Sequence, residues 1–176
     1  MVSSKILSVA VLKMAKFTAL AAAASLAMTA LAGCGTSECE SNEDKKSGCV
    51  QRSHYDDGSV SYEVGWKNHK KNGVEKHYYY NGQLQAEISY KEGKVEGVAK
   101  RWHDNGQLRD EIPYKADEMD GVAKSWRENG QLRDESSFKM GERDGVFRWY
   151  NKNGELTDKC EYKDGELIKT IKGSCS

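Results

Sequence analysis

A repeat of 24 residues is the feature that most constrains the fold of this chain. The glycine of an Asn-Gly pair recurs every 24 residues, at Gly82, Gly106, Gly130 and Gly154. A Gly-Val pair keeps the same spacing, with its glycine at Gly73, Gly97, Gly121 and Gly145. Repeats of this length indicate an array in which each unit buries its apolar face against its neighbours. The sequence predicts five such units, at 49–72, 73–96, 97–120, 121–144 and 145–168.

Each unit has the pattern of a β-hairpin. In the third unit, apolar and polar side chains alternate over 98–103 and 108–114, and Asn105-Gly106 lies between these runs. Asn-Gly between two alternating runs is a strong hairpin signal. Lys91-Glu92-Gly93-Lys94 provides the turn to the next unit, and the turns at 67–69 and 115–117, which lack this glycine, are expected to be wider. The predicted fold is all-β, an antiparallel meander of about ten strands.

Two registers of the hairpin fit the sequence. A two-residue turn places Lys100 opposite Glu111, but it points Trp102 and Leu108 to opposite faces of the sheet. A three-residue loop with Gly106 in a left-handed bulge position gathers the apolar side chains on one face, and we favour it for that reason. It predicts the pairs Trp102 with Leu108, Lys100 with Asp110, Val98 with Ile112, Trp126 with Leu132, Lys124 with Asp134, Tyr150 with Leu156 and Arg148 with Asp158.

Residues 1–33 have the layout of a signal peptide. Three lysines precede an uncharged run over 17–33, and no acidic residue occurs before Glu38. The run ends in Leu-Ala-Gly followed by Cys34, which resembles the lipobox of bacterial lipoproteins. This resemblance implies cleavage before Cys34 and attachment of lipid to its thiol, whereas the alternative is a buried helix that ends in a chance cysteine. We expect a chain anchored in the cell envelope, in the outer membrane if the cell has two membranes.

The segments outside the repeats are short. Residues 34–48 are rich in serine, acidic residues and lysine, and we expect them to form a flexible tether. Residues 169–176 are expected to form a strand end and a tail.

The cysteine count fits an oxidising compartment. Besides Cys34, four cysteines remain, which is an even number. Of the three pairings, the most local joins Cys39 to Cys49 and Cys160 to Cys175; free thiols are the alternative. A zinc site is disfavoured because the sequence has no Cys-x-x-Cys pair.

Charge and composition exclude several function classes. The chain has 27 basic and 27 acidic side chains and a formal net charge of zero, a balance that does not gather nucleic acids. The histidines, at 54, 69, 77 and 103, do not recur in phase, and no serine lies in a Gly-x-Ser-x-Gly setting. We therefore expect no catalytic residues, no metal site, no cofactor and no nucleic-acid partner.

The units resemble the MORN-repeat variant family. Residues 79–84, Tyr-Tyr-Asn-Gly-Gln-Leu, and residues 90–97, Tyr-Lys-Glu-Gly-Lys-Val-Glu-Gly, fit its pattern closely. Bacterial members of the family are described as antitoxins of toxin–antitoxin pairs. A lipobox departs from what a cytoplasmic antitoxin needs, so the resemblance implies an immunity protein of the envelope.

The hypothesis that follows is a membrane-anchored, non-catalytic module that binds a protein partner, either a toxin or an envelope protein. Its candidate binding face consists of aromatic residues one repeat apart, namely Tyr78, Trp102, Trp126 and Tyr150. The structural alternative is that these side chains form core. The alternative function is a structural envelope protein whose repeats contact lipid or peptidoglycan through a basic row, Lys67, Lys91, Lys115, Lys139 and Lys163.

Overall fold

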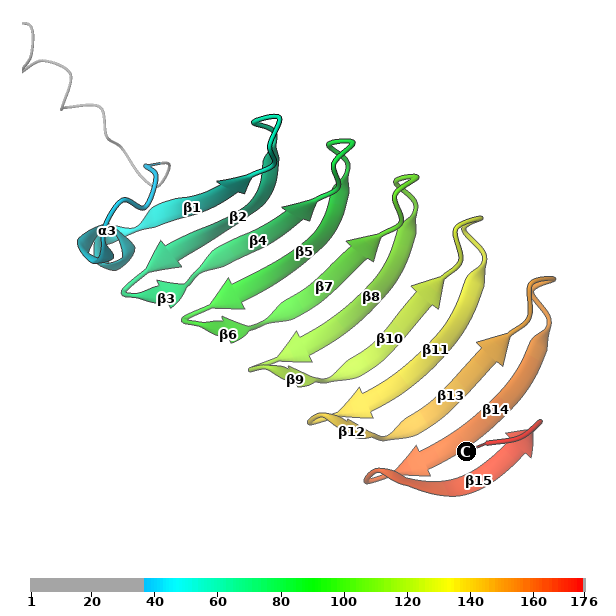
Figure 1. The fold of residues 1–176 in the computed structure, drawn as a ribbon. Helices are drawn as coiled ribbons and strands as arrows, with labels where there is room; N and C mark the ends of the chain where they lie inside the picture. Colours follow the sequence, from blue (N-terminus) through cyan, green and yellow to red (C-terminus); the bar gives the residue numbers. More distant parts are fainter. Residues whose placement is uncertain (1–36, 176) are drawn as a thin grey trace, which may run out of the picture. The chain divides into compact units, whose positions relative to one another are not determined.

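The computed structural model describes residues 37–175, which form one antiparallel sheet and one short helix (Figure 1). The signal peptide and Cys34 lie outside the described residues. The elements are α3 (Asn42–Ser47), β1 (Cys49–His54), β2 (Val60–Lys67), β3 (Lys70–Lys71), β4 (Gly73–Tyr78), β5 (Leu84–Lys91), β6 (Lys94–Val95), β7 (Gly97–Trp102), β8 (Leu108–Lys115), β9 (Glu118–Met119), β10 (Gly121–Trp126), β11 (Leu132–Lys139), β12 (Glu142–Arg143), β13 (Gly145–Tyr150), β14 (Leu156–Lys163) and β15 (Glu166–Lys172).

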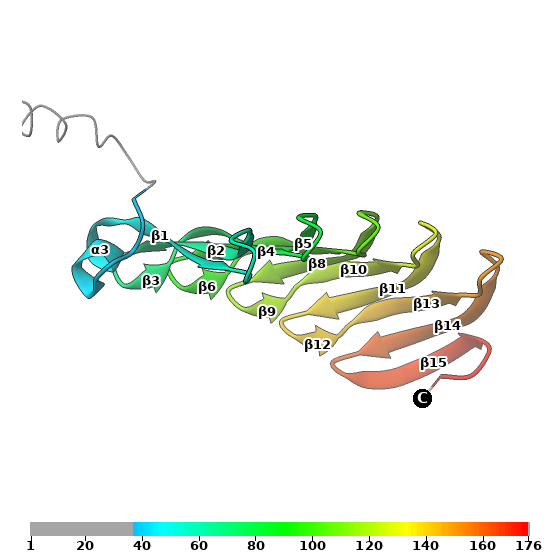
Figure 2. The same cartoon turned by 45° about the horizontal axis from the view of Figure 1, so that its top comes forward.

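The sheet is an open meander, as the sequence predicts. Eleven of its 15 strands follow the order β1-β2-β4-β5-β7-β8-β10-β11-β13-β14-β15, and each of the four two-residue strands pairs with the long strand before it. The strand number exceeds the expected ten because the bend before each next unit separates a two-residue strand, which adds four strands, and because β15 adds a fifth. At the bend before β7, Gly97 has φ 92°, a conformation that only glycine adopts readily. Figure 2 shows how the sheet twists along the array.

The hairpin loops have three residues, and this prediction is confirmed. In the third unit the amide of His103 donates to the carbonyl of Gln107 at 2.8 Å, and that of Gly106 donates to His103 at 2.9 Å. Gly106 has φ 83°, the left-handed conformation expected of the bulge position.

A second bulge follows each loop and corrects the predicted register. Trp102 does pair with Leu108, but Arg101 then pairs with Asp110, so Arg109 is the extra residue. Trp126 with Leu132 and Tyr150 with Leu156 also pair as predicted. Beyond each bulge the side chains shift by one position, so four predicted pairs are wrong, namely Lys100 with Asp110, Val98 with Ile112, Lys124 with Asp134 and Arg148 with Asp158. The observed pairs are Lys100 with Glu111, Val98 with Pro113, Lys124 with Glu135 and Arg148 with Lys159. Ile112 and Asp110 therefore lie on the face opposite to Trp102.

The turns between units are all equally tight, so the prediction of two wider turns is wrong. Lys67 pairs with Lys70 and Lys115 with Glu118, just as Lys91 pairs with Lys94. The turn that lacks glycine at 68–69 has φ 51° and 59° there, the left-handed values of a two-residue hairpin turn.

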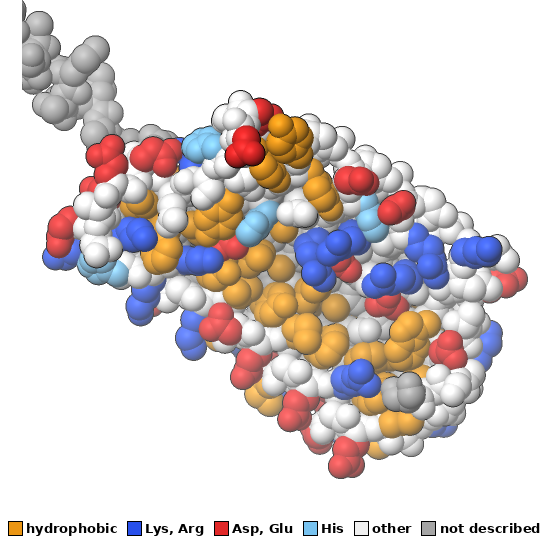
Figure 3. Space-filling model, in the orientation of Figure 1, with side chains coloured by type: hydrophobic (Ala, Val, Ile, Leu, Met, Phe, Trp, Pro, Cys, Tyr) orange, Lys and Arg blue, Asp and Glu red, His pale blue; other side chains and the backbone are white. Residues whose placement is uncertain are grey.

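The sheet has two distinct faces, which we name by their side chains. The core face carries one aromatic residue per unit beside the turns, and these are Trp66, Tyr90, Tyr114, Phe138 and Tyr162. The ladder face carries a row of charged residues and the predicted aromatic residues, Tyr78, Trp102, Trp126 and Tyr150. Most fully buried side chains belong to the core face, where apolar side chains gather in the middle of the sheet and at its C-terminal end (Figure 3).

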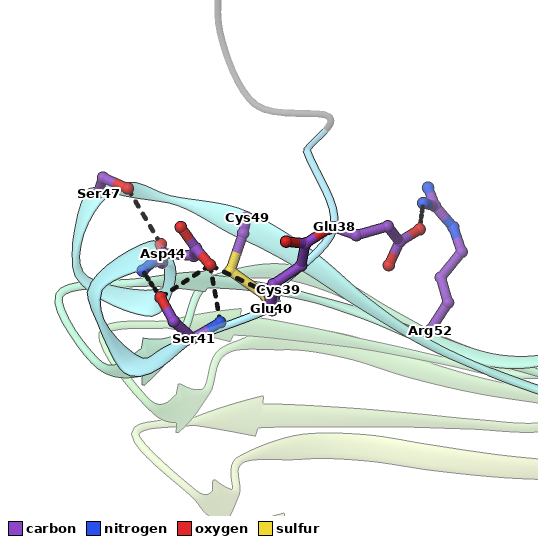
Figure 4. Close-up of a disulfide and its surroundings, with 8 residues drawn as sticks. All are labelled: Glu38, Cys39, Glu40, Ser41, Asp44, Ser47, Cys49 and Arg52. Carbon is purple, nitrogen blue, oxygen red and sulfur yellow. Dashed lines mark hydrogen bonds and ion pairs between the residues drawn. A yellow bond between two sulfur atoms is a disulfide. The ribbon is translucent and has the colours of Figure 1, made fainter.

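The N-terminal end of the array is closed by a folded segment, which corrects the prediction of a flexible tether for residues 37–48. Helix α3 begins with a capping box, in which Ser41 and Asp44 each satisfy the other's backbone amide (Figure 4). Cys39 is disulfide-bonded to Cys49, with their Cα atoms 5.2 Å apart. The ammonium of Lys45 lies 4.4 Å from the ring centroid of Trp66, so the helix packs against the first unit.

The C-terminal end is closed in a similar way. After β15 the tail turns back, and the amide of Ser174 donates to the Asp158 carboxylate at 2.8 Å. Cys175 is disulfide-bonded to Cys160, which is fully buried with Phe147 and Tyr162 in the core cluster. Both ends of the repeat array are therefore closed by non-repeating segments pinned by a disulfide, while its middle has no such cover among the described residues.

Candidate functional site

The predicted aromatic residues lie on the ladder face, one per repeat, at the loop end of the sheet. Each is half-buried and pairs across its hairpin with a leucine, as Trp126 does with Leu132. Trp126 also lines a shallow pocket between two loops, together with Leu108 and Asn129. The four aromatic residues therefore lie on one face of the sheet, and each of them is only partly exposed to solvent.

Hydrogen bonds between repeats hold these aromatic residues in place. In the first four units, the residue before the loop donates through its side chain to the backbone carbonyl of the aromatic residue 23 positions later. The pairs are Tyr55 with Tyr78 at 2.5 Å, Tyr79 with Trp102 at 2.8 Å, His103 with Trp126 at 2.9 Å and Arg127 with Tyr150 at 2.7 Å. The predicted binding row thus forms part of the connection between units, which favours the structural alternative for it.

A row of charges crosses the ladder face from strand to strand. Basic and acidic residues alternate in register, in the order Arg52, Glu63, Lys76, Glu87, Lys100, Glu111, Lys124, Glu135 and Arg148. Neighbours form ion pairs, such as Lys100 with Glu111 at 3.3 Å. From Arg52 to Glu135 each charge faces only the opposite sign, so this part of the face offers little net charge to a partner, whereas Arg148 also faces Lys159.

Glu63 shows how this row couples to the aromatic residues. The hydroxyl of Tyr78 donates to Glu63 Oε1 at 2.9 Å. Burial and this carboxylate raise the pKa of Tyr78 to about 12. Burial alone would raise the pKa of Glu63, but hydrogen bonds from Tyr78 and Arg52 outweigh it and lower that pKa.

The core face holds a central groove that sequence reasoning missed. It runs over β5 to β8 and is lined by half-buried apolar side chains, namely Ile88, Tyr90, Val95, Ala99, Ile112 and Tyr114. Tyr90 and Tyr114 belong to the series of aromatic residues followed by lysine that recurs every 24 residues. That spacing is the available signal, but the bulge at Arg109 places Tyr114 and Ile112 on the face opposite Trp102, together with Ala99.

Three arginines lie near the loop end of the core face, and one of them, Arg101, lines the central groove. Arg101 and Arg109 both reach the same oxygen of Asp110, at 3.1 and 2.8 Å, and Arg133 reaches Asp134 at 2.7 Å. The side chain of Asp110 is 10% exposed and that of Asp134 18% exposed. The three arginine side chains are 38% to 49% exposed. The guanidinium groups of these arginines are therefore exposed to solvent, and the aspartate carboxylates that neutralise them lie beneath.

A buried polar cluster lies at the N-terminal side of the central groove. Glu75 is 5% exposed and is bonded by Lys71 and, at 2.8 Å, by His77. Burial would raise the pKa of Glu75, but these hydrogen bonds lower it overall. Lys71 also lies 4.8 Å from the ring centroid of Tyr90. The charged groups of this cluster pair with one another, and the cluster bounds the groove on that side.

The predicted lysine row lies along the turn edge of the sheet and is exposed throughout. Its cationic character is confined to the first two units. Across the turn, Lys67 and Lys91 face another lysine, whereas the other three lysines face Glu118, Glu142 and Glu166. In residues 37–175 we find no group of three metal-ligating side chains. No helix in this same part is long and apolar enough to cross a membrane.

The fold and its grooves define a non-globular repeat protein of stacked β-hairpins. The chain belongs to the MORN repeat variant family, whose model matches residues 71–92, 95–116, 119–140 and 143–164, half of the sequence. Among solved structures, the crystal structure of TarM is similar over 56% of this chain and 20% of that chain, with 11% identity and a TM-score of 0.35. This chain thus spans about a fifth of the length of that structure. A comparison with curated proteins finds no match.

Proposed function

We propose that the protein is a lipid-anchored, non-catalytic module that holds a protein partner on the middle of its core face. The observation that carries the proposal is the open central groove between the two disulfide-closed ends of the sheet. A contiguous apolar surface beside polar groups is characteristic of protein-binding sites. The aromatic row on the ladder face is a weaker candidate because its residues connect the repeats.

The lipid anchor at Cys34 is the second part of the proposal. It is supported by the lipobox-like sequence and by the disulfides near both ends of the sheet, which suit an oxidising compartment. We further propose that the partner is a toxin or an envelope protein, as the antitoxin resemblance and the anchor together suggest. Cys34→Ser should shift the protein from the membrane fraction to the soluble fraction.

The binding surface is tested by capture from detergent-solubilised envelope with the full chain. Val95→Glu puts a charge into the central groove, and Val98→Glu puts the same charge on the exposed ladder face, where Val98 is 45% exposed. We expect Val95→Glu to lose the captured protein and Val98→Glu to keep it. Equal capture by both variants would show that the groove is not the binding surface.

The structural envelope alternative has less support. Three of the five lysines in the row face a glutamate, so the row lacks the uniform positive charge that an anionic surface selects. Binding of the Cys34→Ser chain to anionic vesicles would revive this alternative.

A further inference from the structure

The middle of the core face carries two parallel columns of side chains, one apolar and one cationic. Tyr90 and Tyr114, one repeat apart, represent the apolar column, which forms the central groove. The cationic column consists of Arg101, Arg109 and Arg133, and Arg101 also lines the groove. Figure 3 shows basic side chains beside the apolar area of this face. A matching partner needs an apolar stripe with acidic groups along one flank.

The arginines are available to such a partner because their own carboxylates bind only part of each guanidinium. Arg109 reaches Asp110 through Nε, and Arg133 reaches Asp134 through Nε as well. A guanidinium presents five N–H donors, so several donors on each arginine remain for a second carboxylate. The arginine side chains are also far more exposed than the aspartates beneath them.

The spacing along the columns selects the secondary structure of the partner. Equivalent residues of adjacent repeats are two strands apart, which is about 9.6 Å at the usual strand spacing. Residues seven apart in an α-helix are separated by about 10.5 Å and lie on the same side. Residues two apart on an extended strand are separated by about 6.8 Å, which does not match the repeat. A helix lying across the strands therefore fits the columns, and an extended segment does not.

We propose that the central groove binds an amphipathic helix of the partner, with its apolar stripe on Tyr90 and Tyr114, which lie one repeat apart, and two carboxylates, seven residues apart, on Arg109 and Arg133. This inference rests on the proposed function, which it deepens by naming the chemistry of the partner. Docking of an amphipathic helix into an apolar groove is a recurrent mode of recognition. The acidic flank would set the register of the helix, because each carboxylate has its own arginine.

The experiment uses the full chain in detergent and three synthetic helical peptides, each with the same leucine stripe. The first has glutamates seven residues apart along one flank, the second has lysines there, and the third has glutamates five residues apart. We expect calorimetric titration to show binding of the first peptide, and at least tenfold weaker binding of the other two. Equal binding of all three peptides would overturn the proposal, because the cationic column would then play no part.

Variants locate the peptide on the chain. Arg109→Gln and Arg133→Gln should each weaken binding of the first peptide by about tenfold, the usual effect of losing a charge-assisted hydrogen bond. Lys124→Gln is the matched control on the ladder face, where Lys124 pairs with Glu135 at 3.5 Å, and it should bind as the unaltered chain does. Thermal melting of each variant checks folding, and Arg109 can be removed because Arg101 still pairs with Asp110. Unchanged binding by both folded arginine variants would overturn the proposal.

Two further results separate this inference from the proposed function. If Val95→Glu abolishes envelope capture but no acidic peptide binds, the groove binds a protein of another kind and only the helix is wrong. If neither capture nor peptide binding depends on Val95, both proposals fail. Vesicles of anionic phospholipid provide the remaining test, since vesicle binding that Val95→Glu abolishes, without peptide binding, would assign the groove to lipid.

Discussion

The hydroxyl of Tyr79 donates a hydrogen bond to the backbone carbonyl of Trp102, 2.8 Å away in the next repeat. The corresponding side chain of other units makes the same bond, although it is a histidine in one and an arginine in another. These side chains all carry a hydrogen-bond donor at their far end. The contact between units is therefore fixed by hydrogen bonding at this position rather than by residue type.

We expect Tyr79→Phe to destabilise the chain by about 1 kcal/mol, since it removes only this hydroxyl and leaves a half-buried carbonyl without its partner. Urea denaturation of the two chains measures the difference. Tyr80→Phe is the matched control, because the neighbouring Tyr80 is 64% exposed. A loss of the same size in both variants would show that the bond between units contributes nothing.

His69→Gly is expected to stabilise the chain by about 1 kcal/mol. His69 has φ 59°, and its equivalent in the next unit, Gly93, has φ 86°. A side chain in this left-handed region costs about 1 kcal/mol relative to glycine. Gly93→Ala is the reverse change and should destabilise by a similar amount, as two denaturation curves would show. A destabilised His69→Gly chain would mean that the imidazole makes a favourable contact that outweighs backbone strain.

The stability of the chain should fall above pH 10, partly through Tyr78. Its pKa is about 12 in the folded chain and about 10 when exposed, so between these values only the unfolded chain loses the proton. The contribution of Tyr78 is therefore complete below pH 10 and is lost as the pH rises toward 12. Tyr78→Phe should lower stability at neutral pH and flatten the alkaline decline. Urea midpoints from pH 8 to 11.5 measure both effects, and identical slopes would contradict the assignment.

Phe147→Ala and Trp126→Ala compare the two faces. Phe147 is 3% exposed in the core cluster, and its truncation should cost about 3 to 5 kcal/mol. Trp126 is half-buried on the ladder face and packs on Leu132, so we expect a smaller loss of about 2 kcal/mol. Thermal or urea unfolding measures both losses. An unchanged melting temperature in Trp126→Ala would mark this indole as a free surface group and revive the ladder face as the binding site.

The sequence predicts the repeat, the strands and the loops because each depends on local residue patterns. Asn105-Gly106 specifies the three-residue loop, and the loop in turn fixes Trp102 opposite Leu108. The bulge at Arg109 could not be predicted, because an arginine can occupy it as well as many other residues and no glycine marks it. That single extra residue moves every later side chain of the strand to the other face.

The central groove was missed for the same reason. The sequence marks Tyr114 and Ile112 as apolar positions, but the predicted register places both on the face of Trp102. The tight turns at 68–69 and 116–117, which lack glycine, could not be predicted for a different reason. They are stabilised by contacts with neighbouring segments. The amide of Asn68 donates to Lys46 at 3.0 Å, and that of Ala116 donates to the Glu96 carboxylate at 2.9 Å. Such partners are distant in sequence and leave no local signal.

The two disulfide-pinned ends allow the length of the array to change without new chemistry. Because both closing segments are made outside the periodic part, insertion or loss of one 24-residue unit between them leaves Cys39 with Cys49 and Cys160 with Cys175. Such a change would lengthen or shorten the two side-chain columns by about 9.6 Å per unit. Gene duplication within this chain could therefore adjust the reach of its surface in fixed steps.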